Sequence, residues 1–280
     1  MSTTPASLSA ALPVIAFIGG GNMASALIGG LIRQGLPASQ IEVVEPWADA
    51  RAALHTLYGL EAQAEAGPAL QRAGIVVWAV KPQTFQEAAA QARTWTQDAL
   101  HLSVAAGIRS DSIAQWLGSE RIVRTMPNTP ALVGKGISAL YARPAVSAAE
   151  RQSLEAIMAP TGEFLWVDRE AQLDAVTALS GSGPAYVFYF LEAMARAGTG
   201  MGLSEAQAHQ LAVGTFVGAA ELARRSTESP AVLRERVTSK GGTTYAALQS
   251  MEQAGVGEAF VRAMQAAEQR ARELGDEFGK

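Results

Sequence analysis

The sequence contains no cysteine, which excludes disulfide bonds, thiolate metal ligands and a cysteine nucleophile. It has only three histidines, His55, His101 and His209, and they stand far apart, with no spacing typical of a metal site or a catalytic triad. No cluster of carboxylates makes up for them. We therefore predict no metal centre and no chemistry that depends on a histidine base. The missing cysteines fit a reducing compartment.

Charge is also scarce, and neither sign dominates. Charged residues make up 17% of the chain, and the net charge is −4, without the basic excess typical of nucleic-acid binders. The one long uncharged stretch, residues 175–191, contains Gly181, Gly183 and Pro184 as helix breakers, so it predicts a buried helix pair rather than a membrane span. Residues 1–12 carry no Lys or Arg before their apolar run, unlike a signal peptide. We expect a cytoplasmic protein that binds neither nucleic acid nor membrane.

The first part of the chain alternates short apolar runs with helical patterns. Continuous rather than alternating apolar runs are typical of strands buried on both faces, and strands that alternate with helices indicate a parallel sheet. Residues 1–168 therefore predict an α/β domain, a Rossmann-type doubly wound parallel sheet. The expected strands are residues 14–18, 41–44, 75–80, 100–104 and 121–125, with 136–141 and 163–167 as edge strands around a helix at 148–158.

Residues 169–280 contain no strong strand pattern and predict an all-α domain. The expected helices are residues 172–179, 184–197, 205–225, 231–237, 244–253 and 258–273, and Ser204 and Ser229 are candidate N-caps for two of them. So many apolar residues in a small helical domain would leave a large apolar surface exposed, and such surfaces usually bind a partner. We infer a homo-oligomer that associates through this domain.

A glycine-rich segment follows the first predicted strand. Gly19-Gly20-Gly21-Asn22-Met23-Ala24 fits the G-x-G-x-x-A dinucleotide fingerprint. Gly19 permits the tight turn, Gly21 lets a pyrophosphate approach the backbone, and Ala24 allows close helix packing. The phosphates would lie at the positive end of the following helix, beside Asn22 and Met23. The segment predicts an NADH or NADPH site.

Glu45 ends the second predicted strand and bears on the choice between the two cofactors. A carboxylate there can accept hydrogen bonds from the adenosine ribose and would repel a 2′-phosphate, which favours NADH. Arg51 could still turn toward such a phosphate, and Glu45 could instead be an ordinary solvated residue at a strand end.

Three further loops follow predicted strands and should share one edge of the sheet. Lys81 is placed for a ribose hydroxyl or a phosphate. The small residues Ala105, Ala106 and Gly107 leave room for a flat ring. Asn128 or Thr129 can hold a carboxamide or ribose. Each loop alone could be an ordinary connection, but together they indicate the nicotinamide end of the site.

Two polar, glycine-rich segments interrupt the helices of the second domain, residues 180–186 and 237–244. The second resembles an anion nest at the start of a helix and would suit a small carboxylate. A plain helix–helix connection explains the same residues equally well.

Taken together, these motifs resemble those of the pyrroline-5-carboxylate reductases along nearly the whole chain. The segments that carry the resemblance are Phe-Ile-Gly-Gly-Gly-Asn-Met-Ala (17–24), Ala-Val-Lys-Pro-Gln (79–83), Arg-Thr-Met-Pro-Asn-Thr-Pro (124–130), Leu-Ser-Gly-Ser-Gly-Pro-Ala-Tyr (179–186) and Val-Thr-Ser-Lys-Gly-Gly-Thr-Thr (237–244). The resemblance implies hydride transfer from NADPH or NADH to a cyclic imino acid, which yields proline. It also implies a domain-swapped helical dimer, often assembled into a ring of dimers, with an active site between the two domains.

The resemblance also implies residue roles. The backbone of Ser239, Lys240, Gly241, Gly242 and Thr243 would bind the substrate carboxylate, and the Thr244 hydroxyl would hydrogen-bond the ring nitrogen. Lys81, Asn128 and the 105–107 loop would hold the nicotinamide end, so Thr244 and Lys81 are the candidate catalytic residues. Lys240 stands where many members have proline; it could add a cation near the carboxylate or point to solvent.

Two alternative functions remain open from the sequence. A β-hydroxyacid-type dehydrogenase would need a general base, which that class supplies as a lysine in its helical domain. The comparable region here, residues 181–195, has no lysine. A dinucleotide-binding oligomer that senses redox state without catalysis is the second alternative.

Overall fold

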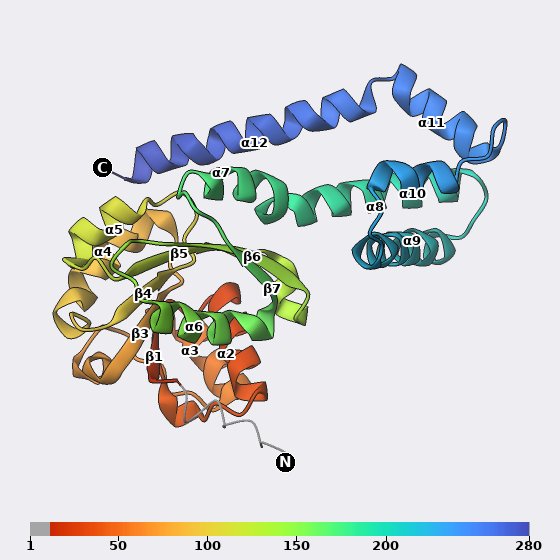
Figure 1. Ribbon diagram of the computed structural model, residues 1–280. Helices are drawn as coiled ribbons and strands as arrows, with labels where there is room; N and C mark the ends of the chain where they lie inside the picture. The colour runs from red at the N-terminus through yellow and green to blue at the C-terminus, as the bar shows by residue number, and fades with distance from the viewer. Residues whose placement is uncertain (1–11, 280) are drawn as a thin grey trace, which may run out of the picture. The chain divides into compact units, whose positions relative to one another are not determined.

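The computed structural model describes residues 12–279 and contains two compact units. Almost all of the N-terminal segment considered above lies outside the described residues. The first unit comprises the chain up to Ser182 together with the last helical turns from Ala267, and the second runs from Gly183 to Ala266. Figure 1 shows the sheet of the first unit and the long helices.

The first unit is built around a seven-stranded sheet with the order β2-β1-β3-β4-β5-β6-β7. β1 to β5 are parallel, and β6 runs antiparallel to β5 and parallel to β7. The predicted Rossmann-type sheet is therefore confirmed. Its strands are β1 (Val14–Ile18), β2 (Ile41–Val44), β3 (Ala73–Trp78), β4 (Leu100–Ser103), β5 (Ile122–Met126), β6 (Gly136–Ala142) and β7 (Gly162–Trp166).

Two details of the sheet differ from the sequence-based expectation. β6 was expected at the edge but lies between β5 and β7, so only β7 closes that side. On the other side, a single parallel bridge joins Val44 to Gln63 beyond β2. If this bridge is counted as a reduced strand, the parallel part of the sheet has the 3-2-1-4-5-6 strand order of dinucleotide-binding folds, and β6 and β7 extend it.

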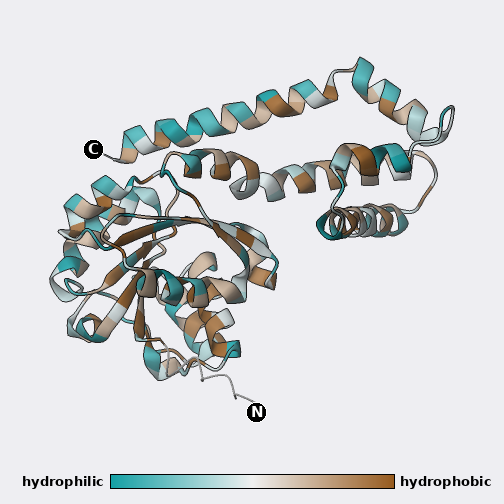
Figure 2. Ribbon diagram, viewed as in Figure 1, coloured by the Kyte–Doolittle hydropathy of each residue, from teal (hydrophilic) through white to brown (hydrophobic). Residues whose placement is uncertain are grey.

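Helices cover both faces of the sheet, because the strands bury alternate residues on opposite sides (Figure 1). In β1, Ile15 and Phe17 pack against α2 (Asn22–Arg33), α3 (Ala48–Tyr58) and α6 (Ala148–Met158). Ala16 and Ile18 instead belong to the core beneath α4 (Pro82–Ala92) and α5 (Ser110–Leu117). Figure 2 shows the strands as largely hydrophobic.

The chain enters its helical part through α7 (Gln172–Val176) and a π-helical turn, Thr177–Gly181. The sequence predicted that Gly181, Gly183 and Pro184 would break the helix here. Instead the chain stays helical and takes up an extra residue in one wider π turn. In this turn the Ser182 N–H donates to the Thr177 carbonyl at 2.8 Å. Helix α8 (Gly183–Gly200) begins directly afterwards. Because α7 packs against β5 and β6, the first compact unit extends past the predicted boundary at Asp168 to Ser182.

The second unit contains α8, α9 (Glu205–Arg225), α10 (Pro230–Arg236), α11 (Thr243–Gln253) and the first part of α12 (Val256–Phe278). Both predicted N-caps are confirmed: Ser204 accepts from the Gln207 N–H and Ser229 from the Val232 N–H. α8 packs against α9, and the rings of Tyr186 and Phe190 contact Phe260 edge-on. No helix in the described part of the chain is long and apolar enough to cross a membrane.

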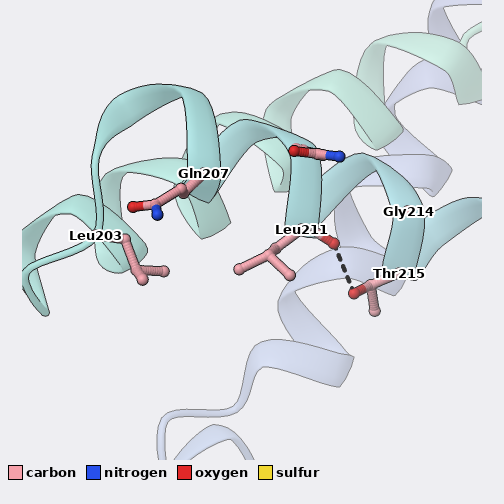
Figure 3. Close-up of a pocket in the computed structure, with 6 residues that line it drawn as sticks. Leu203, Gln207, Leu211, Gly214 and Thr215 are labelled. Carbon is pink, nitrogen blue, oxygen red and sulfur yellow. Dashed lines mark hydrogen bonds between the residues drawn. The ribbon is translucent and has the colours of Figure 1, made fainter.

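The helical unit buries very little apolar surface within one chain. Among its described residues, Ala208 and Ala212 are the only hydrophobic side chains that are fully buried. Large side chains such as Phe188 and Leu211 are 64% and 59% exposed. One hollow lies along a face of α9, lined by Leu203, Gln207, Gln210, Leu211, Gly214 and Thr215 (Figure 3). This lining has no ionisable group, so the hollow is suited to packing rather than to catalysis.

Candidate functional site

The loops with the predicted cofactor residues lie at one edge of the first unit. Because β1 to β5 are parallel, the segments after their last residues meet at the carboxyl edge of the sheet. These segments contain Gly19, Glu45, Lys81, the 105–107 loop and Asn128. The strand order reverses between β1 and β3, and ligands bind at such a switch point in open α/β sheets.

The glycine-rich turn fits a pyrophosphate. Gly19 has a φ of +96°, and a Cβ there would lie 2.5 Å from the Ala79 carbonyl oxygen, so only glycine is accommodated. By contrast, nothing lies within 4 Å of the position that a Gly21 Cβ would take. Gly21 is the N-cap of α2, and no side chain caps the helix. Backbone N–H groups at the positive end of α2 therefore face open space beside Asn22, while Ala24 is fully buried.

Glu45 is not the solvated strand-end residue that the sequence left possible. Its side chain is only 6% exposed, and both carboxylate oxygens accept backbone hydrogen bonds. The Gly20 N–H donates to Oε2 at 2.7 Å, and the Trp47 N–H donates to Oε1 at 2.9 Å. The carboxylate therefore joins the glycine-rich turn to the turn that begins α3.

Lys81 and the 105–107 loop frame the next part of the edge. Lys81 is exposed and is the N-cap residue of α4. Ala105 and Gly107 are buried and Ala106 is half-buried. Gly107 has a φ of +73°, and a Cβ there would lie 2.9 Å from the Leu274 Cβ of α12. The last turns of α12 thus press on the loop that was predicted to face the nicotinamide.

Asn128 is tied into the structure on both sides of its amide. Its Nδ2 donates to the Ser180 carbonyl at 3.1 Å, and its Oδ1 accepts from the Ile137 N–H at 3.0 Å. Nearby, a Cβ at Gly181 would lie 2.5 Å from the Met126 Cε. The 126–130 loop and the π turn, distant in sequence, are therefore locked together.

A cluster of charges beneath this edge was missed by the sequence analysis. Glu170 accepts from the backbone N–H and the hydroxyl of Ser110, both at 2.6 Å, and from Arg124 Nη1 at 2.7 Å. Ser110 begins α5, three residues after Gly107, so Glu170 fixes the exit of the 105–107 loop. A charged residue inside an apolar strand, as Arg124 is in β5, was the signal that a buried partner should exist.

A small cavity of about 210 Å³ adjoins this cluster, lined by Gly107, Arg109, Arg124, Glu170, Ala171, Asp174 and Gly275. Burial raises the pKa of Asp174 above its ordinary value, although Arg124 and Arg109 oppose the shift. Arg109 also forms an ion pair of 2.5 Å with Asp276, which anchors the end of α12 next to the same loop.

The predicted substrate segment connects α10 to α11 in the helical unit. The Gly242 N–H donates to the Ser239 carbonyl at 3.0 Å, and Gly241 has a φ of +75°, which together match a type II turn. Gly242 is the N-cap of α11, again without a side-chain cap, and Thr243 and Thr244 are the first helical residues. Backbone N–H groups at this helix start are directed outward beside the exposed Thr244, as an anion nest requires.

The remaining ionisable groups do not suggest another chemistry. Within the described residues, no group of three or more His, Asp or Glu side chains is placed to hold a metal ion. His101 is buried and accepts a hydrogen bond from Trp78 Nε1 at 3.1 Å, and burial lowers its pKa to about 4. It is a packed side chain whose ring nitrogen is already hydrogen-bonded.

The sheet, its switch point and the uncapped glycine turn define a dinucleotide-binding oxidoreductase followed by a helical unit. Comparison with known proteins is more specific. Residues 14–107 match the family described as "NADP oxidoreductase coenzyme F420-dependent", and residues 170–274 match "Pyrroline-5-carboxylate reductase dimerisation". The chain is 45% identical to the pyrroline-5-carboxylate reductase of Pseudomonas aeruginosa over 96% of its own length and 99% of that protein.

Solved structures agree. A pyrroline-5-carboxylate reductase from Coxiella burnetii superposes with a TM-score of 0.87 at 36% identity, covering 94% of this chain and 98% of that one. The NADP-bound pyrroline carboxylate reductase of Plasmodium falciparum gives a TM-score of 0.85 at 27% identity, with 94% and 98% covered. The chain belongs to the pyrroline-5-carboxylate reductase family, which confirms the resemblance drawn from its motifs.

Proposed function

We propose that this protein reduces 1-pyrroline-5-carboxylate to L-proline with NADH or NADPH, the last step of proline biosynthesis. The observation that carries the proposal is family membership over nearly the whole chain, joined to a carboxyl edge shaped for a dinucleotide. The NADP in the Plasmodium falciparum structure supports a nicotinamide cofactor. The curated relatives favour this reaction over a hydroxyacid dehydrogenase or a sensor.

The cofactor is assigned to the first unit. Its pyrophosphate binds at the start of α2 beside Gly19, Gly21, Asn22 and Met23, because no side chain caps this helix start. The buried Ala24 supports the site by letting α2 pack closely on the sheet. Glu45 binds the adenosine ribose.

Lys81, Ala105, Ala106, Gly107 and Asn128 bind the nicotinamide half of the cofactor. When bound, the cofactor supplies the hydride that is added to the imine carbon. Asn128 also holds its loop in place, since its amide is hydrogen-bonded to Ser180 and Ile137.

The substrate is assigned to the 239–244 segment. The backbone of Ser239, Lys240, Gly241, Gly242 and Thr243, with the positive end of α11, holds the carboxylate. The Thr244 hydroxyl hydrogen-bonds the ring nitrogen, where the proton that completes the reduction resides. Reduction of a protonated imine needs orientation more than a strong base. This requirement fits residues 12–279, where no cluster of three or more His, Asp or Glu side chains is found.

We further propose a homodimer that associates through the helical unit and assembles into a ring of dimers in the cytoplasm. The match to a dimerisation family and the near absence of a core in this unit, as far as it is described, support association.

Steady-state oxidation of NADH and NADPH with pyrroline-5-carboxylate tests the reaction. We expect turnover by the unaltered protein and a loss of about 10²-fold or more in kcat/KM for Thr244→Val, with cofactor affinity unchanged. Ser250→Ala removes an exposed hydroxyl from the same helix and is the matched control. Cofactor binding without turnover in the unaltered protein would contradict the proposal.

A further inference from the structure

The turn after β2 carries a fixed negative charge. Glu45 directly follows β2, and the N–H groups of Gly20 and Trp47 hold its two carboxylate oxygens in place. A Cβ at Gly20 would lie 3.3 Å from the Glu45 Cγ, so the side chain packs against the glycine-rich turn. A buried side chain held at both oxygens has little freedom to move aside for a ligand.

In dinucleotide-binding sheets the adenosine ribose lies at the end of the second strand, next to the glycine-rich turn. Each Glu45 oxygen accepts one backbone hydrogen bond and keeps a lone pair for a ribose hydroxyl. A 2′-phosphate at the same place would bring negative charge against a carboxylate that is already largely removed from water. Like charges brought together in this way disfavour binding strongly.

The charged neighbours of Glu45 in this turn are Arg51 and Asp49. Arg51 was the residue that could have turned toward a 2′-phosphate, but its Nη1 donates to the carbonyls of Glu45 and Pro46, at 2.9 and 2.7 Å. These two bonds orient Nη1 toward the backbone of the turn, and a phosphate could be reached only by Nε or Nη2. The same turn also carries Asp49, in the first turn of α3. Residues 45–51 thus contain two carboxylates and one guanidinium that is tied to carbonyl groups.

From this geometry we propose that Glu45 makes the protein prefer NADH over NADPH, by binding the ribose diol and excluding a 2′-phosphate. The inference rests on the proposed use of a nicotinamide cofactor. It sets this chain apart from the NADP-bound neighbour from Plasmodium falciparum.

The test is a titration of the full-length protein with NADH and with NADPH, followed by nicotinamide fluorescence without any imine. We expect NADH to bind at least ~10-fold more tightly, and Glu45→Gln to reduce that ratio by ~10-fold or more. Glu61→Gln removes the same charge from a side chain that is 83% exposed, and it should leave the ratio unchanged. Taking the ratio within each variant cancels a general loss of folded protein.

Equal or tighter binding of NADPH by the unaltered protein would overturn the inference, as would an unchanged ratio in Glu45→Gln. If Glu45→Gln does not fold, Glu45→Ser replaces it. The ratio of NADH to NADPH affinity in the unaltered protein tests the inference in either case. Selective NADH binding without imine reduction would contradict the proposed reaction but uphold this inference. Imine reduction with a preference for NADPH would do the reverse.

Discussion

The side-chain amide of Asn128 donates a hydrogen bond to the Ser180 carbonyl, and its carbonyl oxygen accepts one from the Ile137 N–H. One nearly buried residue therefore joins the loop after β5 to the π turn and to β6. These bonds give Asn128 a structural role in addition to the ligand contact that the sequence suggested.

Asn128→Ala should lower the free energy of unfolding by about 1–3 kcal/mol, because it leaves buried hydrogen-bonding groups unpaired. Chemical denaturation measures this loss. Asn128→Asp keeps the acceptor for Ile137 but loses the donor to Ser180, so it separates the two bonds. An alanine variant of unchanged stability would show that water replaces the amide.

Lys240 occupies the second position of a type II turn whose third residue, Gly241, has a φ of +75°. Proline is favoured at that second position, and within the described structure the Lys240 N–H donates no backbone hydrogen bond. Lys240→Pro should therefore raise stability by about 0.4–1 kcal/mol by restricting the unfolded chain. Gly241→Ala, by contrast, should cost about 1–2 kcal/mol, since its φ is left-handed. Destabilisation by the proline would show that the turn has another geometry.

The helical unit should depend on association for its stability. We expect the melting temperature to rise with protein concentration, because the apolar side chains that are exposed in one chain would be covered on association. Leu211→Glu places a charge in the hollow along α9 (Figure 3) and should produce smaller species in analytical ultracentrifugation. Leu57→Glu, at an equally exposed leucine on α3, is the control. A melting temperature independent of concentration would contradict this prediction.

His101 should make the protein sensitive to acid. Burial lowers the pKa of His101 to about 4, below the ordinary 6.5. Between these two pH values the unfolded chain binds a proton at His101 and the folded protein does not. The stability from this group is present above pH 6.5 and is lost as the pH falls toward 4, by about 3 kcal/mol at most. Chemical denaturation at several pH values between 4 and 6.5 measures this loss. The free energy of unfolding should change less with pH in His101→Gln than in His55→Gln, where the exposed histidine is replaced.

Gly107→Ala should disturb the loop assigned to the nicotinamide. The new alanine would keep a backbone φ of +73°, and its Cβ would lie 2.9 Å from the Leu274 Cβ. Gly118→Ala has a similar φ of +68°, but its nearest atom is 3.9 Å away, so it measures the backbone strain alone. We expect a larger loss of stability and a weaker cofactor affinity only for Gly107→Ala. Leu274→Gly removes the Cβ that the new side chain would meet, so it should partly restore the cofactor affinity if the clash is the cause.

Local patterns were sufficient for much of the fold. The strands 14–18 and 41–44 and the helices 148–158 and 205–225 have the predicted bounds, because apolar periodicity and capping residues act over a few neighbours. The glycine-rich turn was also predicted from the sequence. A glycine is required at position 19, because its φ and its closeness to Ala79 leave no room for a side chain. The π turn was not, because local preference at Gly181 and Gly183 favours a break, whereas contact with Met126 and Asn128 keeps the chain helical.

The sequence by itself determined the strand–helix alternation, the division into a sheet and a helical part, and the motifs that mark the family. Only the tertiary structure decided that Glu170 meets Ser110 and Arg124, that the end of α12 packs against Gly107, and that Glu45 is held by two backbone N–H groups while Arg51 is tied to carbonyls. These contacts join residues far apart in the chain or depend on side-chain direction. No short-range periodicity encodes such contacts, because they form only when the packed sheet brings its loops to one edge.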